Sequence, residues 1–346
     1  MSRLNKTKQI YLIFSIGLLL CACKHRNDVD VSNIKLEVKI QRFDKDFDAM
    51  RTKPMAIQAA FLGKKYGVFY RDYLALLLQT PGIKLQDTAY FQLLRKVFAN
   101  ADYNSLSHDV DSVFKNTDKE NEELTDAFKH IKYYFPKKNL PVVYAYFSGF
   151  EAQTVIGNRY FGIGLDLFLG GDSRFYPSLT NAYPHYMSRF FNRQNITPRV
   201  VEGIVRGDMY PESDSSKSLL SKMIYNGKIL YFMDKMLPGV GDTTKIGYTT
   251  AQLNWCTQFE SKIWAFFLEQ NLLYETDYQK IQKYVTEAPF TPGLGEKSES
   301  APKLGIWTGW QIVRAYMEKH HEVTLPALMA NTDAQKILDD SRYRPK

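Results

Sequence analysis

The spacing of the apolar residues changes twice along this chain of 346 residues, and each change restricts the fold. From residue 54 to residue 134, apolar side chains recur at the three- to five-residue intervals that indicate helices. Residues 141–165 hold short β-branched and aromatic runs, which predict strands. From residue 176 onward the helical spacing returns. The pattern predicts an α+β fold in which a helix-rich chain contains one small sheet of about four strands.

Four segments are expected to form this sheet. Residues 34–40 alternate apolar and polar side chains, which predicts a strand with one buried face. Residues 141–147 form a compact apolar run that is typical of a buried strand. The runs 154–156 and 160–165 follow, and Gly157-Asn158 between them is a hairpin signal.

Local signals also place several helix ends. Pro81-Gly82 is expected to separate two helices, and Thr197-Pro198 to open another. A long helix is predicted from residue 219 to 237. Thr249 and Gln252 have the spacing of a capping box, which predicts a helix from there to about residue 272. Residues 289–302, rich in Gly, Ser and Pro, indicate a surface loop.

The N-terminus has the features of a bacterial secretory leader. Basic residues precede an apolar run from Ile10 to Leu20, and this run is shorter than the roughly 20 apolar residues of a membrane span. Leu20 and Ala22 ahead of Cys23 resemble a lipobox, which implies cleavage before Cys23 and attachment of diacylglyceryl to its sulfur. Acyl chains there would anchor the protein in a membrane. A signal anchor and a plainly secreted protein are the alternatives.

We therefore expect three parts: a signal peptide at 1–22, a lipidated Cys23 with a polar tether at 23–33, and a single α+β domain at 34–346. The net charge of +8 includes three basic residues in the leader, and no dense basic block follows. Nucleic acid is therefore not an expected partner. Cys256 lies at helical spacing among aromatic residues, so we expect it to be a buried apolar side chain and not a nucleophile.

No motif of a known enzyme class stands out. The chain has no His-Glu-x-x-His, and its six histidines include no pair at i and i+4. It has no Gly-x-Ser-x-Gly, and the Gly-rich segment 162–166 lacks the later Gly of a dinucleotide loop. Glu202 and Glu212 are possible general bases, but lone carboxylates on helices are usually only solvated. We expect no metal, no cofactor and no catalytic residue.

Several short motifs together resemble a known family. In chain order they are IQRFD at 40–44, YYFP at 133–136, SGF at 148–150, GLDLFLG at 164–170, YP at 176–177, GIWTGWQIV at 305–313 and SRY at 341–343. With the lipobox, their order and the chain length resemble the gliding-motility lipoprotein family GldB over nearly the whole mature chain. This resemblance implies an envelope lipoprotein that is required for surface gliding and has no established enzymatic activity.

That family is itself distantly similar to zinc peptidases that carry His-Glu-x-x-His and a later Glu-Gly. At the corresponding positions this chain has Val201, Glu202 and Val205, and then Asn226 before a Gly. The three ligand positions thus lack zinc-binding side chains, and only Glu202 is retained. The resemblance implies a degenerate, zincin-like scaffold with a vestigial metal site at Val201, Glu202, Val205 and Asn226. Alternatively, the two valines are ordinary helix core.

These features together favour an outer-membrane lipoprotein that faces the periplasm and is not an enzyme. It would be a component or assembly factor of the gliding apparatus and the associated secretion system, with envelope proteins of that machinery as partners. The alternatives are a cryptic hydrolase of peptidase ancestry and a glycan-binding surface lipoprotein. Aromatic residues at helical spacing are more often core than sugar platforms, which disfavours the glycan binder.

Overall fold

The computed structural model describes residues 29–78, 87–213, 217–295 and 300–346. The predicted leader, Cys23 and the Pro81-Gly82 helix break lie outside these residues. Residues 34–346 form one compact unit, and the described residues 29–33 do not belong to it. Among the described residues, no helix has both the length and the apolar character needed to cross a membrane.

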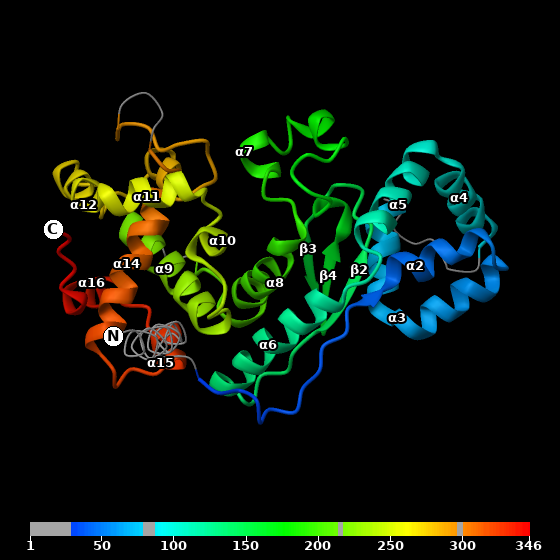
Figure 1. The fold of residues 1–346 in the computed structure, drawn as a ribbon, viewed down its shortest axis with the longest axis horizontal. Coiled ribbons are helices and arrows are strands. Elements are labelled where there is room, and N and C mark those ends of the chain that lie inside the picture. The colour runs from blue at the N-terminus through cyan, green and yellow to red at the C-terminus, as the bar shows by residue number, and fades with distance from the viewer. Residues whose placement is uncertain (1–28, 79–86, 214–216, 296–299) are drawn as a thin grey trace, which may run out of the picture. The chain divides into compact units, whose positions relative to one another are not determined.

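Helices make up most of the larger unit, and one small sheet lies among them (Figure 1). The strands are β1 (Gln41–Arg42), β2 (Val142–Tyr146), β3 (Thr154–Gly157) and β4 (Tyr160–Gly164). The helices are α2 (Phe43–Asp48), α3 (Met55–Leu78), α4 (Thr88–Ala99), α5 (Ala101–Val113), α6 (Asp118–Tyr134), α7 (His185–Ser188), α8 (Ile196–Ile204), α9 (Leu219–Met236), α10 (Asp242–Ile246), α11 (Thr250–Gln258), α12 (Glu260–Glu269), α13 (Tyr278–Ile281), α14 (Leu304–Lys319), α15 (Leu325–Ala330) and α16 (Ala334–Ser341). The predicted α+β class is confirmed.

The sheet has the strand order β1-β2-β4-β3. β2 runs parallel to both β1 and β4, and β3 pairs antiparallel with β4 through the predicted hairpin. The predicted strand at 34–40 is wrong, because only Gln41 and Arg42 pair with β2. The backbone N–H of Val38 donates instead to Thr125 Oγ1 at 2.9 Å, and that of Ile40 to Asn121 Oδ1 at 2.8 Å. Side chains of α6 therefore take the hydrogen bonds that a neighbouring strand would have taken.

Side chains of the central strands β2 and β4 alternate between two faces, and both faces of these strands are covered. Val143 and Ala145 of β2 belong to the main core, which includes residues of α6 and α8. Tyr144 and Tyr146 point to the other face, where they join an aromatic cluster with Phe69 of α3. In Figure 1, α2 and α3 lie on one side of the sheet, and α6 and α8 on the other. This arrangement fixes α8 against the sheet.

Helices α9 and α14 pack unusually closely. A Cβ atom added to Gly309 would lie 1.9 Å from the carbonyl oxygen of Met223, and one added to Gly227 would lie 2.3 Å from that of Gly309. Real Cβ atoms do not approach backbone this closely, so only glycine allows this crossing. The two glycines thus set the separation of the helices that flank the site described below.

Two other predictions need correction. The capping box exists, since Gln252 N–H donates to Thr249 Oγ1 at 3.2 Å and Thr249 N–H to Gln252 Oε1 at 2.9 Å. The helix that it opens is interrupted at Phe259, however, where φ is −108° and ψ is 17°, and α12 follows. The segment 289–302 is also not wholly a surface loop. Thr291 and Ser300 are buried, and the Ser300 hydroxyl bonds the backbone of Thr291.

Candidate functional site

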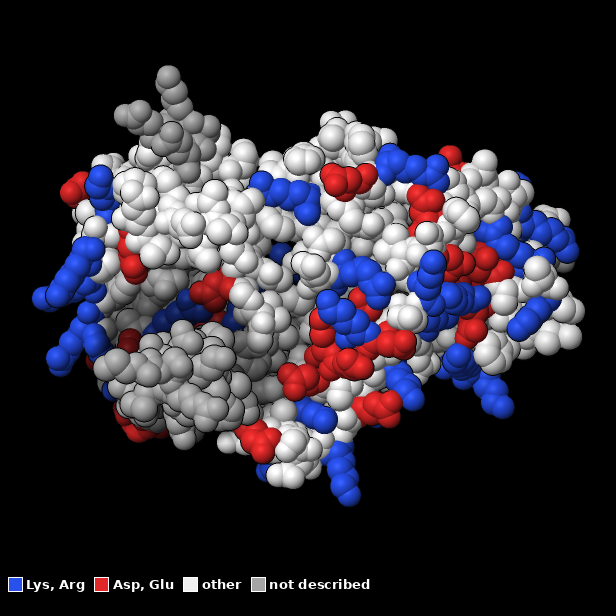
Figure 2. Space-filling model, viewed as in Figure 1, with Lys and Arg blue, Asp and Glu red and all other residues white. Residues whose placement is uncertain are grey.

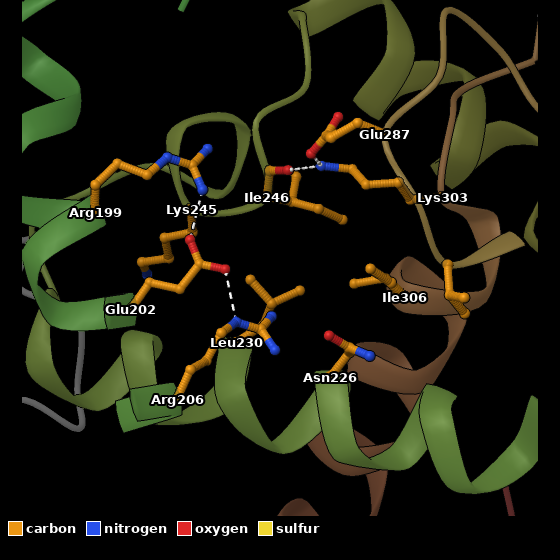
Figure 3. A pocket seen from close by; sticks show the side chains of 11 residues that line it. Arg199, Glu202, Arg206, Asn226, Leu230, Lys245, Ile246, Glu287, Lys303 and Ile306 are labelled. Carbon is orange, nitrogen blue, oxygen red and sulfur yellow. Dashed lines mark hydrogen bonds and ion pairs between the residues drawn. The ribbon is translucent and has the colours of Figure 1, made fainter. Parts of the chain in front are cut away.

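A pocket of about 220 Å³ lies between α8 and the pair α9 and α14 (Figure 3). Charged side chains and a few apolar ones line it: Arg199, Glu202, Arg206, Asn226, Leu230, Lys245, Ile246, Val285, Glu287, Lys303 and Ile306. These residues come from α8, the turn after it, α9, α10, the segment before α14, and α14 itself. The pocket thus depends on the tertiary fold and not on one local motif.

Glu202 lies between two arginines. Arg199, Glu202 and Arg206 occupy positions i, i+3 and i+7, which share one face of a helix. Arg199 Nη1 donates to Glu202 Oε2 at 2.5 Å, and Arg206 Nε to Oε1 at 2.9 Å. Arg206 sits in a π-helical turn, Val205–Met209, that continues α8. Burial raises the pKa of the Glu202 carboxyl, but the two guanidinium charges outweigh burial and lower this pKa from 4.5 to about 2.

Lys303 closes the opposite wall. It is the residue before the first turn of α14, and it is buried in a left-handed conformation with φ of 52° and ψ of 37°. Its Nζ donates to the Ile246 carbonyl at 2.6 Å and to Glu287 Oε1 at 2.5 Å. Burial lowers the pKa of this ammonium. Figure 3 shows Lys303 and Glu287 across the pocket from Glu202.

Lys245 of α10 is a further cationic side chain that lines the pocket. Its buried Nζ lies 3.0 Å from Asp234 Oδ1. Asp234 also accepts two hydrogen bonds from Arg314, which in turn binds Asp242. This network lies behind the pocket and holds α9, α10 and α14 together.

The chemistry of the central carboxylate is restricted by its partners. A general base works best with a pKa near the ambient pH, and a group with a pKa of about 2 has little proton affinity at neutral pH. Glu202 is therefore a fixed negative charge at pH 7. Within the described residues, no three His, Cys, Asp or Glu side chains lie close enough together to hold one metal ion.

The structure brings together two of the four positions predicted for a vestigial metal site. Glu202 and Asn226 both line the pocket, and Asn226 Nδ2 donates to the Lys222 carbonyl at 2.8 Å. Val201 and Val205 are completely buried in the main core and are not among the lining residues. Descent of the scaffold from a zinc peptidase stays a prediction. Cys256 is buried as expected, and burial raises the pKa of its thiol.

Sequence reasoning missed the cationic side chains of the pocket. Arg199 and Arg206 could have been found, because Arg-x-x-Glu-x-x-x-Arg in a predicted helix places two arginines beside Glu202. Lys245 and Lys303 gave no such signal, since each lies at least 39 residues from Arg206 in the chain. Only the packing of α10 and α14 against α8 and α9 brings them into the same pocket.

One comparison with known proteins gives a match. A family model described as gliding motility protein GldB matches residues 24–345. This range includes every residue that lines the pocket. No curated protein and no solved structure matches the chain.

Proposed function

Because the chain belongs to the GldB family of gliding-motility lipoproteins, we propose that it is a non-enzymatic component or assembly factor of the gliding apparatus. The family match over residues 24–345 carries this proposal, since it spans the whole domain and not a single motif. The proposal extends to the secretion system associated with gliding. Envelope proteins of that machinery would be its partners.

The proposed location follows from the leader. A lipid on Cys23 would hold the domain at the outer membrane through the short polar segment that precedes residue 34. The residues directly after Cys23 are Lys24, His25 and Arg26, and no acidic cluster follows them. An acidic cluster at this position is associated with export to the cell surface, so its absence from the sequence favours the periplasmic face.

The pocket supports a role without catalysis. Glu202 is the one charged side chain kept from the peptidase-like pattern, and its proton affinity is suppressed by Arg199 and Arg206. A carboxylate held in this way stabilises neighbouring cations more readily than it removes a proton from water. A non-enzymatic component needs no general base, so its function should not depend on proton transfer by Glu202.

A complementation experiment tests the proposal. A strain that lacks the gene should lose colony spreading, and the wild-type gene should restore it. Glu202→Gln should restore spreading equally well, at an abundance matched by immunoblot. Glu122→Gln is the matched control, because it makes the same change at an exposed glutamate of α6. The proteins released into the medium should be profiled in the same strains to read out secretion.

Two results would contradict the proposal. Normal spreading by the deletion strain would show that gliding does not require this protein. Loss of spreading with normally abundant and normally folded Glu202→Gln, but not with Glu122→Gln, would contradict this proposal and return attention to the hydrolase alternative.

A further inference from the structure

The charged pocket around Glu202 has more positive than negative side chains. Its lining includes four cations, Arg199, Arg206, Lys245 and Lys303, but only two carboxylates, Glu202 and Glu287. Extending the set of described residues to the network behind Lys245 adds Asp234, Arg314 and Asp242. That larger set still has five cations against four carboxylates. The internal ion pairs therefore leave positive charge in the pocket.

Hydrogen-bond donors are also in excess. Each guanidinium has five N–H donors, and Glu202 accepts one hydrogen bond from Arg199 and one from Arg206. Arg206 also lies over the Tyr225 ring at 5.6 Å from its centroid and has a side-chain hydrogen bond with Tyr225. Figure 3 shows Arg199 and Arg206 on either side of the Glu202 carboxylate, with the open part of the pocket beyond them. An incoming group with acceptor oxygens could use the remaining donors.

The start of α14 adds to this potential. Lys303 and Ile306, which are the capping residue and the third residue of this 16-residue helix, both line the pocket. The first N–H groups of a helix have no partner within the helix and carry partial positive charge. No side chain caps this end, because Lys303 has no acceptor group. The Ile306 N–H donates to the Lys303 carbonyl at 2.9 Å, so this helix end contributes the positive end of its dipole to the pocket wall.

The backbone at Lys303 has a left-handed conformation. A non-glycine residue with φ of 52° is held in a conformation that costs about 1–3 kcal/mol. The conformation places a buried ammonium at the pocket wall, where Ile246 and Glu287 bind two of its three donors. Lys303 therefore combines a strained backbone with a buried ammonium, and it lines the pocket.

We propose that this pocket binds a single oxyanion group, a carboxylate or a phosphate, carried by a small molecule or by the end of a larger one. Guanidinium groups match the geometry of both oxyanions, and one negative charge fits the charge that the internal pairs leave. The volume of about 220 Å³ is below the usual range for a complete drug-sized ligand, so it fits one such group with a short stem. On the side of the molecule where α9 and α14 lie, Figure 2 shows acidic and basic side chains inside a hollow of the surface.

Glu202 has a defined part in this proposal. Its carboxylate shares Arg199 and Arg206 with the incoming anion and therefore competes with it for them. Removing the carboxylate should tighten anion binding, whereas removing a guanidinium should weaken it. A purely structural ion-pair network would give no binding at all, and damage to the fold would weaken binding in both variants. The opposite signs thus distinguish a binding site from a structural one.

Isothermal titration calorimetry of the full chain in detergent tests the proposal, with inorganic phosphate and acetate as separate probes at constant ionic strength. We expect saturable binding of at least one probe, about tenfold tighter in Glu202→Gln and about tenfold weaker in Arg206→Gln. Arg95→Gln, a change at an exposed arginine of α4, is the matched control and should leave binding unchanged. Binding of phosphate alone identifies a phosphate group as the ligand, and binding of acetate alone identifies a carboxylate.

Dissociation constants weaker than about 10 mM for both probes would overturn the proposal. Equal weakening by Glu202→Gln and Arg206→Gln would also overturn it. Neither result bears on the role in gliding, because that role is read out by colony spreading and not by anion binding.

Discussion

Replacing Glu202 by Gln should change how the stability of the domain depends on pH. The carboxyl has a pKa of about 2 in the folded chain and an ordinary value of 4.5, so its ionised form stabilises the fold. This contribution is about 3 kcal/mol at neutral pH and is lost as the pH falls from about 4.5 toward 2. Gln does not titrate, so the variant lacks this pH-dependent part of the stability.

The size of the effect can be stated for an accessible range. Between pH 7 and about pH 3.5, a group with these two pKa values loses about 1.4 kcal/mol of its stabilisation. The difference in unfolding free energy between wild type and Glu202→Gln should therefore shrink by about this amount over that range.

Urea denaturation followed by circular dichroism at several pH values measures this difference. Glu122→Gln, at an exposed position on α6, controls for the introduction of a glutamine. If the difference in unfolding free energy between wild type and Glu202→Gln stays constant over the whole pH range, the reasoning is refuted. It would mean that Arg199 and Arg206 do not hold the carboxyl in its ionised form.

Three further changes probe the packing around the site. Gly309→Ala forces a Cβ atom into the α9 backbone and should lower the free energy of unfolding, measured by urea denaturation, by about 1–3 kcal/mol or more, whereas Gly239→Ala enters open space and should not. Burial lowers the pKa of Lys228 from 10.5 to about 8, so the unfolded chain binds more protons between these values and stability should rise by about 2 kcal/mol from about pH 7.5 to about pH 9.5. Lys228→Met should abolish that rise, and a rise that persists in this variant contradicts the assignment. Val201→His combined with Val205→His should lower the free energy of unfolding by about 1–3 kcal/mol per imidazole in the same urea assay, because both sites are buried in an apolar core. An unchanged urea midpoint would show that these sites accept polar groups.

Elements with local signals were predictable from the sequence. The hairpin between β3 and β4 follows from Gly157-Asn158, and the start of α11 from the capping box at Thr249. The strand expected at 34–40 failed for a non-local reason. Alternating side chains favour an extended backbone, but the partner of that backbone is a helix 80 residues later, whose Thr125 and Asn121 side chains accept its N–H groups. Periodicity does not reveal where such hydrogen bonds go.

The same distinction applies to the pocket. Glu202 and Asn226 drew attention in the sequence because they stand at positions of a peptidase-like pattern, and both line the pocket. Lys303 could not be recognised, because its role depends on a left-handed backbone and on contacts with Ile246 and Glu287 from other segments. Charged residues that come together only through tertiary packing show no recognisable spacing in the sequence.

The central claim is that this protein is a membrane-anchored component of the gliding apparatus. Colony spreading of a deletion strain that expresses Cys23→Ser tests this claim most directly. Serine has no thiol to carry the lipid, so the precursor should stay unprocessed and lack acyl label. The account predicts that this variant does not restore spreading, although Glu202→Gln does. Full spreading by a Cys23→Ser chain that carries no acyl label would contradict the account, because the domain would then act without its anchor.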